Sequence, residues 1–181
     1  MIKEDLPYKP YYCEENIWHL CNNFKPHNFE KYVVIISNAQ KECAFSYQQL
    51  GSPNNNNTVI FDYHVILVVL HDNWHVYDFD TILGFPVLLE EYSAKTFQNR
   101  YRTKNLPYFR IIPADDYSTL FSSDRSHMSI KGKWIQPPPA WPKIFKESSN
   151  IRDFIDLKND FIGHTMDYEH FMDFFKNKIR Q

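Results

Sequence analysis

Two apolar segments in the middle of the chain constrain its fold more than any other feature. Residues Val59–Leu70 and Trp74–Phe79 are rich in β-branched and aromatic side chains, and the polar residues His71-Asp72-Asn73 separate them. This pattern predicts two strands joined as a β-hairpin. The middle of the chain is therefore expected to form an antiparallel sheet.

Helical and β patterns on both sides of the hairpin complete the predicted fold. Glu14–Phe24 has an apolar stripe at helical spacing and two glutamates in its first turn, and Pro26 is expected to stop it. Other segments are predicted as strands (Tyr32–Ile36, Ala44–Gln48 and Tyr108–Ile112), as helices (Val87–Phe97, Ala114–Phe121 and Tyr168–Lys178) and as loops (Gly51–Asn57 and the Pro-rich Ser129–Ser149). A first helix, a mainly antiparallel sheet and flanking helices indicate an α+β layered fold. A length of 181 residues suits a single domain over 1–181.

Composition and charge exclude several classes of function. A formal net charge of -2 gives no reason to expect nucleic acid or a membrane surface as a partner. Residues 1–7 lack the apolar core of a secretory signal, and the longest aliphatic run, Val65–Leu70, is far too short to cross a bilayer. The cysteines Cys13, Cys21 and Cys43 show no zinc-site spacing. We expect these thiols to be reduced, which indicates the cytosol or nucleus. We also expect the protein to be a monomer.

Ionisable residues interrupt the apolar pattern of the hairpin. With His71-Asp72-Asn73 as the turn, His64 lies opposite Asp80, and Asp78 is its diagonal neighbour on the same face. Diagonal residues of paired strands lie about 7–8 Å apart, within reach of a hydrogen bond between His and carboxylate. Side-chain alternation adds Asp62 to this face. Three acids around one His exceed what a structural His needs, and geometry leaves Asp78 and Asp80 as alternative partners of His64.

Cys13 stands at the start of the first predicted helix. A thiol in this place feels the positive end of the helix dipole, which favours the thiolate. With His64 as a base and an aspartate to orient that base, the chain has the groups of a cysteine-nucleophile enzyme in the order Cys, His, Asp. The alternative is a structural Cys that packs as a small hydrophobe. The sequence has no G-x-S-x-G nucleophile elbow, which a Ser/His/Asp hydrolase would need, and no Gly-rich phosphate-binding loop.

A dense polar cluster, Ser123–Met128, follows the helix predicted over 114–121. The side chains of Asp124 and Arg125 suit the binding of a polar ligand. The alternative interpretation is a capped turn with an internal Asp–Arg pair. Local sequence does not choose between the two.

The residues described so far resemble a known family, the protein N-terminal glutamine amidohydrolases. The matching segments occur in the family's order and at similar spacing over most of the chain; they are Tyr12–Trp18, Asp62–Val65, Tyr77–Thr81, Ser123–Met128 and Pro137–Pro139. Phe61, where the family usually has Trp, and the Asn-rich loop depart from the family pattern without touching the chemistry. The resemblance implies a core similar to that of papain and transglutaminase, with a nucleophile helix packed against a sheet that carries His and Asp.

The resemblance also implies a reaction and a role for each residue. Cys13 would be the nucleophile, His64 the base and Asp78 the orienting carboxylate, so the resemblance favours Asp78 over Asp80. The reaction is hydrolysis of the side-chain amide of an N-terminal Gln in proteins and peptides, through a Cys thioester, to N-terminal Glu and ammonia. No metal or other cofactor is expected. In the family the product enters the N-degron pathway of protein degradation.

Such a substrate carries a free α-ammonium group close to the reacting amide, so the site is expected to offer it an acid. The candidates for substrate binding are Glu14, Glu15, Asp62, Asp80, Asp124 and Arg125. Two other interpretations stay open. One is a cysteine peptidase or transglutaminase with the same three catalytic residues; the other is a non-catalytic binding module that uses the Pro-rich segment as a ligand.

Overall fold

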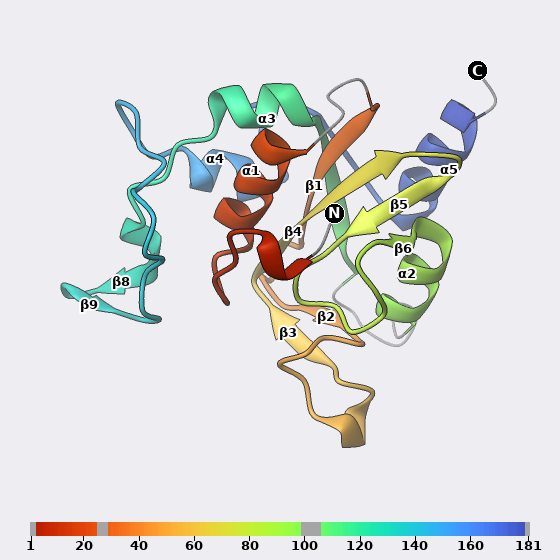
Figure 1. The fold of residues 1–181 in the computed structure, drawn as a ribbon, viewed down its shortest axis with the longest axis horizontal. Helices are drawn as coiled ribbons and strands as arrows, with labels where there is room; N and C mark the ends of the chain where they lie inside the picture. Colours follow the sequence, from red (N-terminus) through yellow and green to blue (C-terminus); the bar gives the residue numbers. More distant parts are fainter. Residues whose placement is uncertain (1–2, 25–28, 99–105, 180–181) are drawn as a thin grey trace.

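The computed structural model describes residues 3–24, 29–98 and 106–179 (Figure 1). Pro26, the predicted helix stop, lies outside the described residues. The helices are α1 (Cys13–Asn23), α2 (Leu89–Thr96), α3 (Ala114–Leu120), α4 (Ile151–Ile155) and α5 (Tyr168–Ile179). The strands are β1 (Lys31–Ser37), β2 (Cys43–Phe45), β3 (Val59–Phe61), β4 (Tyr63–Leu70), β5 (Trp74–Tyr77), β6 (Val87–Leu88), β7 (Tyr108–Pro113), β8 (Ser129–Ile130), β9 (Lys133–Trp134) and β10 (His164–Met166).

A six-stranded sheet in the order β10-β7-β1-β4-β5-β6 forms the centre of the molecule. Every pair of neighbouring strands in it is antiparallel. In the hairpin of β4 and β5, Leu67 pairs with Tyr77 and Leu70 pairs with Trp74, as expected for a turn at 71–73. The predicted hairpin, its register and the α+β class are therefore confirmed.

Alternating side chains of β4 enter two different apolar cores, one on each face of the sheet. Val65 and Leu67 pack with residues of α1, α3 and α4. Ile66 and Val68 point to the other face and pack with residues of α2 and α5. Figure 1 shows α1 and α2 on different sides of the strands β4 and β5. Because both faces are covered, β4 is apolar along nearly its whole length rather than alternating with polar residues.

Several elements differ from the sequence-based prediction. The segment 59–70 is not one strand, because it breaks at Asp62 and its first part, β3, pairs with β2 in a separate two-stranded sheet. The helix predicted from Val87 begins at Leu89, since Val87 and Leu88 pair with β5. The Pro-rich segment contains the short hairpin of β8 and β9. The short elements α4 and β10 were not predicted, because they span too few residues to show a period.

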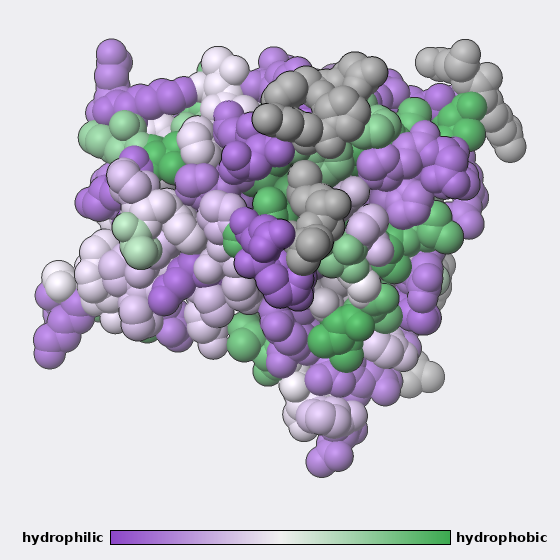
Figure 2. Space-filling model, viewed as in Figure 1, coloured by the Kyte–Doolittle hydropathy of each residue, from purple (hydrophilic) through white to green (hydrophobic). Residues whose placement is uncertain are grey.

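The surface is polar on the face shown in Figure 2, and apolar residues there occupy small separate areas. Within the described part of the chain, no helix combines the length and apolarity needed to cross a membrane.

Candidate active site

The central sheet opens at the beginning of β4, and this opening creates the site. β5 ends at Tyr77, whereas β4 extends to Tyr63, so His64 has no partner on β5. The chain after Tyr77 carries Asp78 and Asp80 past the end of the ladder. The N-terminus of α1, which begins at Cys13, meets the same opening.

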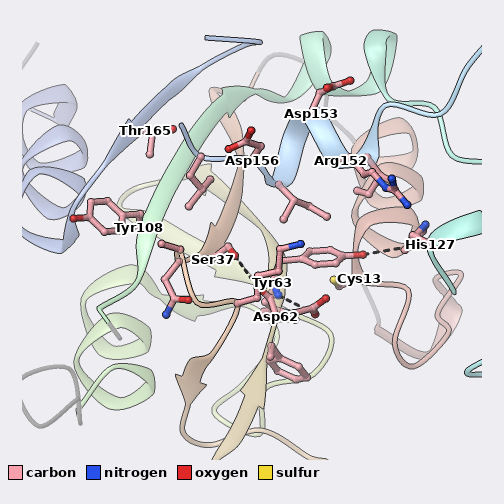
Figure 3. Close-up of a pocket in the computed structure, with 18 of the residues that line it drawn as sticks. Cys13, Ser37, Asp62, Tyr63, Tyr108, His127, Arg152, Asp153, Asp156 and Thr165 are labelled. Carbon is pink, nitrogen blue, oxygen red and sulfur yellow. Dashed lines mark hydrogen bonds between the residues drawn. The ribbon is translucent and has the colours of Figure 1, made fainter. Parts of the chain in front are cut away.

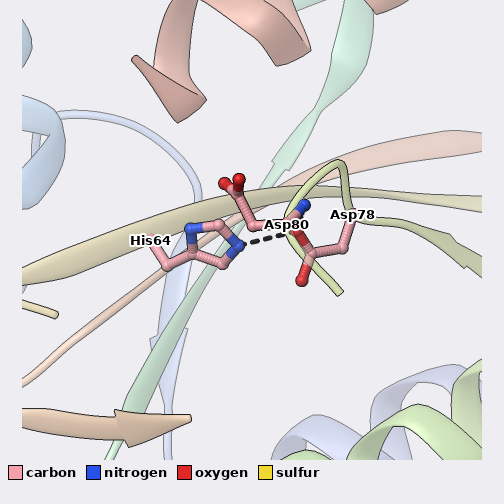
Figure 4. Close-up of side chains that lie close together, drawn as sticks. All are labelled: His64, Asp78 and Asp80. Carbon is pink, nitrogen blue, oxygen red and sulfur yellow. Dashed lines mark hydrogen bonds and ion pairs between the residues drawn. The ribbon is translucent and has the colours of Figure 1, made fainter. Parts of the chain in front are cut away.

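His64 and Asp78 form a buried hydrogen-bonded pair (Figure 4). Nε2 of His64 lies 2.9 Å from Oδ1 of Asp78. The imidazole stacks on the ring of Phe61, with centroids 5.1 Å apart, and meets the ring of Phe45 at an edge. These contacts hold the plane of the imidazole. Phe61, where the family usually has Trp, was expected not to touch the chemistry, but its ring lies directly against His64. Because Nε2 is engaged by Asp78, Nδ1 is the nitrogen available to accept a proton.

The carboxylate of Asp78 is fully buried and has a donor for each oxygen. Oδ1 also accepts the backbone N–H of Asp80 at 2.9 Å, and Oδ2 accepts the hydroxyl of Tyr92 at 2.8 Å and the amide of Gln48 at 3.4 Å. Burial alone would raise the pKa of Asp78, but the charge and hydrogen bond of His64 outweigh it and lower that pKa. Burial would lower the pKa of His64, but Asp78 raises it above its ordinary value. Each group therefore stabilises the charged form of the other.

Asp80 is not the hydrogen-bond partner of His64, although its carboxylate lies nearby (Figure 4). Its Oδ1 accepts the hydroxyl of Tyr8 at 2.6 Å and the amide of Gln49 at 3.2 Å. Burial raises the pKa of Asp80. Sequence geometry left Asp78 and Asp80 as alternative partners of His64. The structure shows that Asp78 makes the hydrogen bond to the imidazole.

His64, Asp78 and Asp80 also form the group of described residues that could hold a metal ion, with one ligand atom of each lying within 4.8 Å of the others. Both carboxylate oxygens of Asp78 already accept hydrogen bonds from N–H and O–H groups of the protein. The chemistry of this donor set therefore favours a His–carboxylate pair over a metal centre.

Cys13 is the first residue of α1, and its thiol is half-buried. Burial raises the pKa of this thiol well above its ordinary value, and the carboxylates of Glu14, Asp80 and Asp62 raise it further. The helix dipole favours the thiolate, but desolvation and the three nearby negative charges oppose it and raise the pKa of the thiol. The thiol needs a base in order to react.

Glu14 lies behind the thiol in a buried polar network. Its Oε2 accepts the hydroxyl of Tyr63 at 3.0 Å and the thiol of Cys13 at 3.7 Å. Its Oε1 lies 3.3 Å from Nε2 of His127. Glu14 is fully buried and does not line the cleft, so these contacts position the first turn of α1.

The other substrate-binding candidates of the sequence analysis lie in different places. Arg125 makes a buried two-pronged ion pair with Glu15, with both nitrogen–oxygen distances at 2.7 Å. The side chain of Asp124 accepts the backbone N–H of Ser126 in a turn. Arg125, Glu15 and Asp124 do not line the cleft, whereas Asp62 and Asp80 do. The predicted internal Asp–Arg pair is replaced by the pair of Arg125 with Glu15.

A cleft with a volume of about 1660 Å³ leads from the thiol across the ends of the strands. Cys13, His64 and Asp80 line one end of it, and residues 151–160 form the far wall. Figure 3 shows Cys13 beside Asp62 and Tyr63, with Arg152, Asp153 and Asp156 across the cleft. The cleft is large enough to admit a peptide segment.

Comparison with known proteins now identifies the family. Residues 8–175 match the family of N-terminal glutamine amidases. The chain belongs to this family. It is 39% identical over 162 residues to proteins from Drosophila melanogaster and Drosophila erecta, each named protein N-terminal glutamine amidohydrolase. The equally named protein from Drosophila mojavensis is 38% identical over 162 residues. These alignments cover 83% of this chain and 78% of each relative.

Membership of the N-terminal glutamine amidase family confirms the resemblance that the sequence motifs indicated, and with it the expectation of an amidohydrolase enzyme. Sequence reasoning missed the residues that surround the predicted centre. Tyr92 and Gln48, which hold Asp78, and Tyr8 and Gln49, which hold Asp80, come from three separate segments. No local pattern marks them, because only the packed fold brings them to the hairpin.

Proposed function

We propose that this chain hydrolyses the side-chain amide of N-terminal glutamine in proteins and peptides, giving N-terminal glutamate and ammonia. Family membership supports the substrate and the reaction. The single structural observation that supports the chemistry is the buried His64–Asp78 pair in the cleft that also contains the thiol of Cys13. We propose these three residues as nucleophile, base and orienting carboxylate.

In the proposed first step, Nδ1 of His64 accepts the proton of the Cys13 thiol as the sulfur attacks the amide carbon. A base is required because burial keeps the pKa of the thiol high. Asp78 holds the imidazole in the tautomer with a proton on Nε2 and stabilises the imidazolium that forms. The attack places negative charge on the amide oxygen.

Backbone N–H groups at the beginning of α1 are suited to meet that oxyanion. The first N–H groups of a helix have no partner within the helix. No side chain of the described residues caps this end of α1. These donors add to the positive end of the helix dipole, which stabilises developing negative charge. One of these donors, the backbone N–H of Cys13, belongs to the same residue as the reacting sulfur.

The remaining steps return the enzyme to its starting state. The imidazolium of His64 gives its proton to the departing nitrogen, so ammonia leaves and a thioester joins Cys13 to the substrate. Neutral His64 then takes a proton from water, and the hydroxide attacks the thioester carbon. The carbon–sulfur bond breaks, the thiolate recovers the proton from His64, and glutamate is released.

The arrangement of a helix-borne Cys against a sheet that carries His and Asp agrees with the papain and transglutaminase core implied by the sequence resemblance. A peptidase or transglutaminase would share these residues but produce different products. Family membership favours the amidohydrolase, and the engaged His64–Asp78 pair gives no support to a non-catalytic binding module.

The experiment that tests the function is an ammonia assay on three matched peptides, which begin with Gln, begin with Asn, or carry Gln only at an internal position. We expect ammonia from the first peptide alone, together with an N-terminal Glu product of unchanged length. An Asn side chain is one methylene shorter and would hold its carbonyl away from the thiol, a misplacement that costs about a hundredfold. Peptide cleavage, cross-linking to amines or equal reaction of internal Gln would contradict the proposal.

A further inference from the structure

Recognition of an N-terminal residue requires a group that detects its α-ammonium, and the structure narrows the choice of that group. Of the acids near the thiol, Glu14 and Glu15 are fully buried and do not line the cleft. Asp62 and Asp80 do line it, and the negative charge of each acts on the thiol of Cys13. The acids of the far wall, such as Asp153, lie across the cleft (Figure 3). Two candidates remain.

Asp80 is already occupied by donors from the protein. It is 4% exposed, and its carboxylate accepts hydrogen bonds from Tyr8 and Gln49 beside His64. An ammonium group bound there would compete with these donors. It would also lie against the imidazole that carries a positive charge during the reaction, which is electrostatically unfavourable.

Asp62 is exposed to the cleft and is held in a fixed position. Its Oδ1 accepts the backbone N–H of Tyr63 at 3.0 Å, and its carbonyl oxygen accepts the hydroxyl of Ser37 at 2.6 Å. Within the described residues, nothing donates a hydrogen bond to Oδ2. Asp62 lies at the break between β3 and β4, two residues before His64, and its carboxylate stands beside the Cys13 sulfur in Figure 3.

We propose that the carboxylate of Asp62 binds the α-ammonium group of the substrate while the side-chain amide of the same glutamine reaches Cys13. This inference rests on the proposed function. The two ends of a glutamine are only a few bonds apart, so one residue can contact both groups. A free amino terminus thereby becomes part of the requirement for reaction, because acetylation removes both the positive charge and the donors that Asp62 accepts.

The test is a comparison of two enzymes with two substrates. Wild type and Asp62→Asn are each assayed for ammonia release from a peptide that begins with Gln and from its α-acetylated form. Wild type should prefer the free peptide on the order of 10⁴-fold in kcat/KM. Asp62→Asn should raise KM for the free peptide roughly 10- to 100-fold, as loss of a charged hydrogen bond does, and change kcat little. The preference for the free peptide should fall by the same factor.

Two further variants separate recognition from a structural role. Asp62→Glu keeps the charge and should retain most of the wild-type preference for the free peptide, whereas Asp62→Asn should lose much of it. Asp173→Asn, the same change at an exposed position on α5, should leave KM and the preference unchanged. If Asp62→Asn does not fold, the preference of wild type and the response of Asp62→Glu still decide the matter.

The outcomes distinguish this inference from the proposed function. Wild type that releases no ammonia from the free Gln peptide overturns the function itself. Wild type that reacts equally well with free and acetylated peptides overturns the ammonium site alone. An unchanged preference in Asp62→Asn, whatever its total activity, shows that another residue detects the ammonium group and also overturns the inference.

Discussion

At the scale of single residues, Asp78 and Asp80 are two positions apart in the sequence but make different contacts in the site. Asp78 contacts His64 and is surrounded by donors, whereas Asp80 is bound to Tyr8 and Gln49. The sequence placed both acids beside the imidazole but could not rank them, because a diagonal and a direct cross-strand neighbour are both within reach. Because β5 ends at Tyr77, both aspartates lie beyond the ladder. The hydrogen bond between His64 and Asp78 shows which of the two is the partner.

Substitution of the two aspartates should have unequal effects on catalysis. Asp78→Asn presents an amide to the imidazole and can stabilise the wrong tautomer, so kcat should fall by up to about 10⁴-fold. Asp80→Asn leaves the His64–Asp78 hydrogen bond intact and should lower kcat far less. Steady-state ammonia release, with circular dichroism to verify folding, measures both. A larger loss in Asp80→Asn would move the orienting role to Asp80.

The protonation states of the thiol and the imidazole predict the acid side of the pH profile. Asp78 raises the pKa of His64 above 6.5, and in the proposed mechanism His64 must be neutral to accept the thiol proton. Activity should therefore be lost at low pH and appear as the pH rises through the raised pKa of His64. The rising limb of kcat/KM reports this group in the free enzyme.

We expect the midpoint of that limb to lie above 6.5, the ordinary pKa of His. A midpoint well below 6.5 would instead indicate a thiolate–imidazolium pair in the free enzyme, with a lowered pKa of the thiol. The sequence alone showed only the helix dipole, which favours the thiolate. It could not include the desolvation of Cys13, which depends on the packing of distant residues.

At the scale of elements, α1 is fixed to the rest of the molecule by buried polar contacts as well as by its apolar face. Arg125 and the indole N–H of Trp141 both bind the carboxylate of Glu15, and the hydroxyl of Tyr117 donates to the backbone of Glu14. These contacts connect the helix that carries Cys13 to α3 and to the segment that follows it. The polar cluster 123–128 is thus structural in large part.

Removal of Arg125 should destabilise the fold, because it leaves the buried carboxylate of Glu15 without its main partner. We expect Arg125→Met to lower the free energy of unfolding by about 3–5 kcal/mol. Glu15→Leu combined with Arg125→Met removes both charges and should recover part of this loss. Urea unfolding of the two single variants and the double variant measures the coupling. Additive losses would show that the pair does not act as a unit.

At the scale of the whole molecule, the sequence predicted the elements with strong periodicity and missed those defined by tertiary contacts. The hairpin of β4 and β5 was predictable in register because its apolar segments are long and its turn is polar. The break at Asp62 was not, because Val59–Phe61 and Tyr63–Leu70 are both rich in β-branched and aromatic residues, and only the pairing of β3 with β2 separates them. The supporting shell of Asp78 combines residues 48, 80 and 92, which no local pattern connects.

The central claim is that Cys13 is the nucleophile of an N-terminal glutamine amidohydrolase. Ammonia release from a Gln-initiated peptide by Cys13→Ala, compared with wild type, tests it most directly. Cys21→Ala and Cys43→Ala are matched controls, since both thiols are buried in apolar cores away from the cleft. We predict that Cys13→Ala loses several orders of magnitude in kcat, as removal of a covalent nucleophile does, while both controls retain most activity. Substantial turnover by Cys13→Ala would contradict the account.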